Sequence, residues 1–136
     1  MSDPCPICGV RHRFLDTNKC SDRQMTESTL QNRVWQRAER RGWKVAHAGR
    51  GFVGGGPGSS GSWITSMAKG WPDLTLAKAG HTLIFMELKR ETESPDEDQR
   101  FWLDLLARCG CLTYVIRPSD LREGRVNAIL DEGSPL

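Results

Sequence analysis

The feature that most constrains the fold is a pair of short apolar segments, residues 74–77 and 82–89, joined by a turn at residues 78–81. Two apolar runs on either side of a glycine-containing turn are typical of an antiparallel β-hairpin. We therefore expect the core of this chain to contain a sheet in which these two strands are neighbours.

The second of these strands carries a row of side chains that changes character along its length. Residues two apart in a strand point to the same face, so Leu83, Phe85, Glu87 and Lys89 form one row. A solvated face would be polar throughout, whereas this row begins apolar and ends in an acid and a base. The pattern predicts a polar site at the rim of a buried sheet, although Glu87 and Lys89 taken alone also fit a surface ion pair.

An acidic residue, Asp73, stands at the start of the first strand, directly after Pro72. Proline has a fixed φ and no N–H to donate, so it suits the turn that leads into the strand. In a regular hairpin Asp73 neighbours Glu87, and two such carboxylates repel unless a proton or a cation intervenes. A hard divalent ion such as Mg²⁺ relieves the repulsion, lowers the pKa of a bound water and steadies the charge on a phosphodiester, while Lys89 orients the nucleophile or stabilises the transition state.

A helix is predicted before the hairpin, where Leu30 and Ala38 belong to an apolar stripe with helical spacing. Thr26 is the expected N-cap, and Gly42 stands where a left-handed residue ends a helix. A strand over residues 43–48 is expected to follow.

A second helix is predicted after the hairpin. Ser94 has the place of the N-cap, Pro95 that of the first helical residue, and Glu97 completes a capping box. Residues 112–116 are predicted as a further strand, and Pro118 as the start of a short last helix. The buried stripe of the second helix is expected to comprise Phe101, Trp102, Leu105, Leu106 and Cys109.

Glycine and serine dominate residues 49–62. Glycine is entropically costly to order, so we predict a mobile surface loop. A phosphate-cradling loop is the alternative, but the lysine–serine ending of a Walker motif does not follow.

Length and charge indicate one domain at residues 25–136, with a small appendage lacking an apolar period at residues 1–24. Neither a membrane-spanning apolar run nor a signal peptide is evident, so we expect a cytoplasmic protein.

The two halves of the chain differ in charge. Residues 1–69 carry 11 Lys and Arg against 5 Asp and Glu, a net charge of +6; residues 70–136 carry 8 against 12, a net charge of −4. This asymmetry either turns the first half toward a polyanion or serves solubility alone.

Three of the five cysteines lie within the first 20 residues. An odd number without a secretion signal favours reduced thiols or metal ligands over disulfides. Cys5 and Cys8 have the spacing of a zinc knuckle, and His12 and Cys20 lie close enough to complete a closed structural Zn²⁺ site. Unligated thiols are the alternative. Two later cysteines either substitute for a ligand or are core or strand residues: Cys109 and Cys111.

Four phrases occur in an order that carries a family resemblance: Lys-Gly-Trp-Pro-Asp-Leu at 69–74, Glu-Leu-Lys at 87–89, Gln-Arg-Phe-Trp-Leu at 99–103 and Arg-Pro-Ser-Asp-Leu at 117–121. Together they resemble the PD-(D/E)xK nuclease superfamily, and within it the VRR-NUC type, small stand-alone nucleases common in bacteriophages. The resemblance covers roughly residues 26–130. It implies an α/β fold with a restriction-endonuclease-like core, in which helices flank a central mixed sheet.

The resemblance also implies roles for individual residues. Lys89 would be catalytic beside Asp73 and Glu87, and Gln99 would support the site. Two alternatives stay open, because Glu27 also fits compensation of a helix dipole and Gln99 also fits a solvated helix position. The implied ligands of a catalytic Mg²⁺ or Mn²⁺ are Glu27, Asp73, Glu87 and the backbone carbonyl of Leu88.

The implied activity is metal-dependent hydrolysis of DNA phosphodiesters in branched, flap or four-way junction DNA, by a chain of a type that often forms homodimers. Two alternatives are a non-catalytic nucleic-acid-binding or protein adaptor with the same fold, and a RecB-like or restriction-type endonuclease that cuts linear duplex. No role is assigned to His47 or His81. The basic residues expected to contact the DNA backbone are Arg33, Arg37, Arg40, Arg41, Lys44, Arg50 and Lys69.

Overall fold

The computed structural model describes residues 17–48, 50–53, 62–65 and 68–133. Within these ranges no helix is long and apolar enough to cross a membrane. The helices are α1 (Thr17–Gln24), α2 (Glu27–Arg40), α3 (Glu97–Arg108), α4 (Pro118–Arg122) and α5 (Arg125–Glu132). The strands are β1 (Lys44–His47), β2 (Arg50–Val53), β3 (Ser62–Thr65), β4 (Leu74–Ala77), β5 (Ile84–Leu88) and β6 (Leu112–Ile116).

The main sheet contains four strands in the order β1-β4-β5-β6. β4 pairs antiparallel with both β1 and β5, whereas β5 and β6 are parallel, so the sheet is mixed. The predicted hairpin is confirmed, with Leu74 opposite Met86 and Leu76 opposite Ile84. Parallel strands need a crossover connection, and α3 forms the one between β5 and β6.

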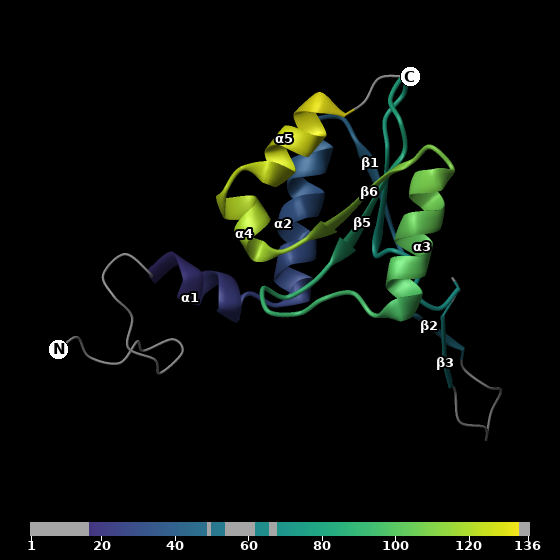
Figure 1. Cartoon of the computed structure of the whole chain (residues 1–136), viewed down its shortest axis with the longest axis horizontal. Coiled ribbons are helices and arrows are strands. Elements are labelled where there is room, and N and C mark those ends of the chain that lie inside the picture. Colours follow the sequence, from purple (N-terminus) through teal and green to yellow (C-terminus); the bar gives the residue numbers. More distant parts are fainter. Residues whose placement is uncertain (1–16, 49, 54–61, 66–67, 134–136) are drawn as a thin grey trace.

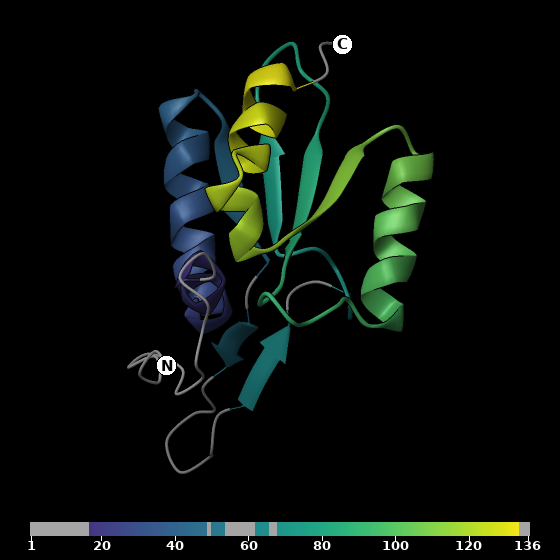
Figure 2. The same ribbon diagram turned by 60° about the vertical axis from the view of Figure 1, so that its left-hand side comes forward.

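Helices cover both faces of this sheet (Figures 1 and 2). α2, α4 and α5 lie on one face, and α3 lies alone on the other. Because side chains alternate along a strand, Phe85 and Glu87 point away from the face that carries the main core. The predicted mixed sheet flanked by helices is therefore confirmed. The core includes Leu30, Val34, Leu74, Leu76, Ile84, Met86, Ile116, Val126 and Leu130.

α2 begins and ends where the sequence predicts. The Thr26 hydroxyl caps the helix by accepting a hydrogen bond from the Thr29 N–H at 3.2 Å. Gly42 follows the last turn with a φ of +84°, a conformation that glycine adopts without strain. Leu30 is fully buried and anchors the helix on the sheet, which leaves Glu27 in the first turn at the edge of the core.

α3 begins later than predicted. Its N-cap is Asp96 rather than Ser94, and the capping box joins Asp96 to Gln99. Both registers have the spacing of a capping box, so the sequence pattern alone does not separate them. In the observed register Gln99 faces β5, while the Ser94 hydroxyl accepts a hydrogen bond from Arg117 Nη2 at 3.4 Å.

The predicted buried stripe of α3 is wrong. None of its residues is fully buried; Phe101 is 61% exposed, Leu105 is 38% exposed, and Cys109 is exposed as well. Only the side of the helix that faces the sheet, with Trp102 and Leu106, is half-buried. The physical reason is that no other described element packs on the outer face of α3, so half of its apolar pattern meets solvent.

The glycine-rich segment is also more ordered than predicted. β2 (Arg50–Val53) and β3 (Ser62–Thr65) form an antiparallel pair of their own, separate from the main sheet. Part of the predicted loop is therefore strand, and residues 54–61 lie outside the described residues. In Figures 1 and 2 this pair projects from the edge of the domain at which α2 and α3 begin.

The N-terminal segment contains a helix, α1, where the sequence predicted no regular structure. The predicted zinc ligands Cys5, Cys8 and His12 lie outside the described residues, and Cys20 falls within α1. α1 is tied to α4 by an ion pair between Asp22 and Arg122.

Candidate active site

The two acids that the sequence singled out lie side by side at one end of the central strands. Asp73 directly precedes β4, and one further step of the register that sets Leu74 opposite Met86 would set Asp73 opposite Glu87. Asp73 Oδ2 accepts a hydrogen bond from the backbone N–H of Leu88 at 2.8 Å, which fixes the carboxylate against β5. The expected juxtaposition of the two carboxylates is therefore observed.

Asp73 is delivered by a turn that packs tightly on α3. Gly70 has a φ of +87°, and a Cβ on it would lie 2.5 Å from the backbone carbonyl carbon of Asp98. Only glycine fits so close an approach to the first turn of α3. The indole N–H of Trp102 donates to the Lys69 carbonyl at 3.1 Å and holds the turn from a second point.

Glu87 is buried, with 2% of its surface exposed. Its Oε1 accepts a hydrogen bond from Gln99 Nε2 at 2.7 Å and lies 3.7 Å from the Lys89 ammonium nitrogen. Its Oε2 is buried without any hydrogen-bond partner. A buried carboxylate oxygen without a donor is costly, so it calls either for a proton, which Glu87 would share with the neighbouring Asp73, or for a cation.

The orientation of Gln99 follows from the capping box. Its amide oxygen accepts from the Asp96 N–H at 2.9 Å, so the amide nitrogen is the end that faces Glu87. This geometry is the one that support of the site by Gln99 requires. A solvated Gln99 would not point its amide at Glu87.

The electrostatics of the site disfavour two free negative charges. Burial, the neighbouring charge of Asp73 and a hydrogen bond between the two carboxyl groups raise the pKa of Glu87, and Lys89 offsets part of the rise, so that the pKa of Glu87 is about 8. Both a proton and a cation satisfy such a pair, and the half-buried ammonium of Lys89 supplies only one positive charge.

Glu27 lies at the mouth of the site rather than within it. Glu27, Asp73 and Leu88 line one hollow of about 330 Å³, to which His47 also contributes. Burial raises the pKa of Glu27, while the charge of Lys89 lowers it and that of Asp73 raises it. In the described part of the chain, however, no three acidic, histidine or cysteine side chains converge into a complete set of metal ligands.

The Leu88 carbonyl has a suitable position. The N–H and C=O of one strand residue point toward the same neighbouring strand, and the Leu88 N–H points to Asp73. The carbonyl therefore faces the hollow that Asp73 and Leu88 line.

Two residues that lie close to the acid pair were not identified from the sequence. His47 was assigned no role, yet the pairing of β1 with β4 places it opposite Leu74 and at the hollow beside Asp73. Trp71 packs edge-on against both Phe85 and Trp102, with ring centroids 5.6 and 5.1 Å apart. Trp71 could have been found from the sequence because it stands beside Pro72 and Asp73. His47 could be found only once the strand order was known.

The predicted DNA-contacting residues do not form one surface around the acids. Arg41 is paired with Asp131 at 2.7 Å, and Lys69 with Asp98 at 3.3 Å. Arg40 and Lys44 are exposed, and Arg50 lies on β2. Arg33 and Arg37 line a different hollow, on the other side of α2.

The two later cysteines are free thiols, one exposed and one half-buried. The expectation that Cys109 is a core residue is therefore wrong, because it is the C-cap of α3 at the solvent. Comparisons of the chain with family models, with curated proteins and with solved structures found no match.

Proposed function

We propose that this protein is a divalent-metal-dependent nuclease that hydrolyses DNA phosphodiester bonds. The observation that carries the proposal is the buried Glu87 beside the half-buried Asp73, with one carboxylate oxygen of Glu87 lacking a donor and the Lys89 ammonium beside the pair. A structural ion pair has no need of a second acid or of a buried oxygen without a partner.

The residues present fit a hard divalent cation such as Mg²⁺ or Mn²⁺. Such ions prefer carboxylate and carbonyl oxygens, and these are the donors that gather here. Asp73, Glu87 and the Leu88 carbonyl would hold the ion, with Glu27 completing the set from the mouth of the hollow. When bound, the cation supplies Lewis acidity that activates water and neutralises charge developing on the phosphate.

The other side chains act on geometry and charge. Lys89 presents an ammonium group, 14% exposed, that orients the attacking water or stabilises the additional negative charge of the transition state. Gln99 donates to Glu87 and keeps one carboxylate oxygen in place, so the unpartnered Oε2 stays aimed at its ligand.

The substrate proposed is DNA, preferably branched, flapped or four-way, as the resemblance to VRR-NUC nucleases implies. The mixed sheet, with Asp73 and Glu87 on adjacent strands and α3 following the Glu-Leu-Lys segment, supports a core of the PD-(D/E)xK type. Zinc binding by Cys5, Cys8, His12 and Cys20 remains a prediction of the sequence.

The test is cleavage of labelled linear, flapped and four-way DNA in Mg²⁺ or Mn²⁺. We expect Asp73→Asn and Lys89→Ala each to reduce the cleavage rate by about 10³-fold, because each removes a group that acts on charge in the transition state. Glu132→Gln, which changes an exposed acid on α5, is the control. Equal cutting by wild type and both site variants would overturn the proposed site.

The homodimer that the resemblance implies is proposed to form through α3. Phe101 and Leu105 lie one turn apart on its outer face, and large exposed apolar side chains in one patch mark interfaces. Glu97 precedes this pair and Arg108 follows it, so two antiparallel α3 helices would place acid opposite base at both ends. We expect Phe101→Glu to convert the dimer to a monomer in analytical ultracentrifugation; a wild-type monomer contradicts the proposal.

A further inference from the structure

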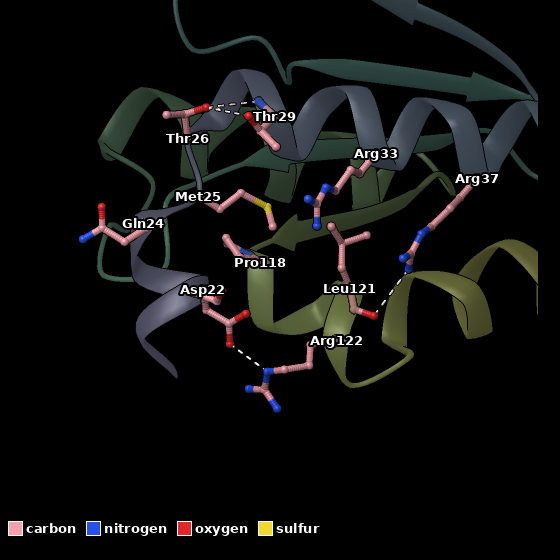
Figure 3. A pocket seen from close by; sticks show the side chains of 11 residues that line it. Asp22, Gln24, Met25, Thr26, Thr29, Arg33, Arg37, Pro118, Leu121 and Arg122 are labelled. Carbon is pink, nitrogen blue, oxygen red and sulfur yellow. Dashed lines mark hydrogen bonds and ion pairs between the residues drawn. The ribbon is translucent and has the colours of Figure 1, made fainter. Parts of the chain in front are cut away.

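α2 separates two hollows of opposite character. One side of the helix contributes Glu27 to the hollow of the candidate active site. The other side faces a hollow of about 460 Å³ between α1, α2 and α4, to which it contributes Thr26, Thr29, Arg33 and Arg37 (Figure 3). The same helix therefore presents an acid to one hollow and two arginines to the other.

Two of the three arginines of this second hollow have no acidic partner in the described part of the chain. Arg122 is paired with Asp22 at 2.8 Å, and Asp22 is the acid that lines the hollow. Neither Arg33 nor Arg37 forms an ion pair with a carboxylate among the described residues. The described lining of the hollow therefore carries an excess of positive charge.

Arg37 is held in place without losing its charge. Its Nη1 donates to the Leu121 carbonyl and to Asn127 Oδ1, at 3.4 Å in each case. Arg33 extends one turn earlier toward Leu121 and Pro118 (Figure 3). Like charges one helical turn apart destabilise a helix, and an anion between them reverses the effect.

The surroundings favour a phosphate over other anions. Guanidinium groups offer a planar fork of donors that matches phosphate oxygens. The apolar floor of the hollow, made by Met25, Pro118 and Leu121, weakens solvent screening of the two charges and provides a surface for a sugar. A bare inorganic anion would leave this floor unused.

We propose that the hollow of Arg33 and Arg37 binds a phosphate of the same DNA strand whose scissile bond lies at Asp73 and Glu87. The inference rests on the proposed function. Glu27 and Arg33 are six residues apart on α2, about 9 Å along the helix axis, and they lie on different sides of the helix. A strand that crosses the start of α2 therefore reaches both hollows within a few nucleotides.

The experiment measures DNA binding without cleavage, in EDTA, by fluorescence anisotropy on a flapped duplex. The full chain is compared with Arg33→Gln, Arg33→Lys and, as a control of equal charge change on α5, Arg125→Gln. Arg33→Gln is expected to weaken binding about tenfold and to make the salt slope of log K less steep by about one. Arg33→Lys is expected to restore the slope more than the affinity, because it keeps the charge and loses the fork.

Further arms identify the source of the phosphate. Substrates with a 5′-phosphate and a 5′-hydroxyl distinguish a terminal from an internal phosphate, and a dependence on Arg33 with either supports the proposal. Competition by inorganic phosphate without any effect of Arg33→Gln on DNA binding overturns it. Binding of phosphatidylserine vesicles, instead of DNA, through Arg33 also overturns it.

Failure of this inference and of the proposed function are distinguishable. If wild type cleaves DNA and Arg33→Gln binds and cuts as well as wild type, the second hollow has no such role and the nuclease proposal stands. If binding depends on Arg33 but neither wild type nor Asp73→Asn cleaves, the nuclease proposal fails on its own. Arg33 is exposed, so circular dichroism and the Tm of Arg33→Gln should match wild type.

Discussion

α2 and α3 cover opposite faces of the same sheet, yet they are attached to it in different ways. α2 buries Leu30, Val34 and Ala38 completely. α3 buries no residue fully; it lies against β6, packs Trp102 on Trp71, and forms hydrogen bonds from Gln99 and Trp102 in its first two turns. One helix is therefore part of the core, whereas the other is a support for the acid pair with a free outer face.

An amphipathic pattern predicts which face of a helix is apolar, but it does not predict whether another element packs on that face. Both helices have apolar residues at helical spacing, and only the α2 stripe has strands and a second helical layer packed against it.

Shortening a buried side chain of α2 should cause the largest loss of stability. Leu30→Ala removes a fully buried side chain and is expected to lower the free energy of unfolding by about 2–5 kcal/mol. Leu105→Ala, the same change on the exposed face of α3, should alter it by no more than about 0.5 kcal/mol when both changes are made in the monomeric Phe101→Glu background. Urea denaturation of both variants measures the two values, and equal losses would contradict the contrast between the helices.

The acid pair should make the metal-free protein pH-sensitive. Glu87 has a pKa raised to about 8 in the folded chain, against 4.5 when unfolded. The protonated form is favoured by folding, so its contribution to stability is complete below pH 4.5 and is lost as the pH rises through 8. Thermal unfolding from pH 5 to 9 should show this fall in wild type.

Two controls sharpen this prediction. Glu87→Gln should remove that part of the pH dependence, and added Mg²⁺ should stabilise wild type at high pH but not Glu87→Gln. An identical pH profile for wild type and Glu87→Gln would show that Glu87 does not carry the titration.

Disturbing the turn at Gly70, which packs on α3, should have an intermediate effect on the free energy of unfolding. Gly70→Ala places a Cβ against the α3 backbone at a positive φ, and we expect a loss of about 1–3 kcal/mol. Gly80→Ala is the matched control, since Gly80 also has a positive φ of +77° but nothing within 4 Å of an added Cβ. A similar loss in both variants would mean that the contact with α3 adds nothing to the backbone strain.

The smallest effect on stability and the most specific effect on the site are expected from Gln99→Leu. It removes the hydrogen bond to Glu87 and the capping bond to the Asp96 N–H, and it keeps the size of the side chain. Metal affinity, measured by titration calorimetry with Mn²⁺, should fall about 10–100-fold, as for other residues that orient a ligand. Unchanged metal affinity would mean that Gln99 serves only as part of the capping box.

Local patterns predicted the parts of this fold that depend on neighbours in sequence. The Thr26 cap, the Gly42 stop and the hairpin between β4 and β5 were all predicted and are confirmed. The start of α3 was not, because Ser94 and Asp96 both have capping-box spacing and only the contact of Gln99 with Glu87 distinguishes them.

Placement of the site was predictable only in part. Asp73 and Glu87 belong to adjacent strands of one hairpin, so their meeting followed from the register. His47 reaches the same hollow through the pairing of β1 with β4, which joins segments separated by the glycine-rich stretch. The arginines of α2 likewise required the position of α4 before two of them could be assigned to one hollow.

The sequence by itself determined the helix caps, the hairpin and the row of side chains that ends in Glu87 and Lys89, since hydrogen bonds and alternation along a strand act over a few residues. Only the tertiary structure decided which apolar face is covered and which charges share a hollow. The physical reason is that burial and charge compensation depend on elements distant in the chain. The exposed Phe101 shows this for burial, and Arg33, which has no carboxylate partner among the described residues, shows it for charge.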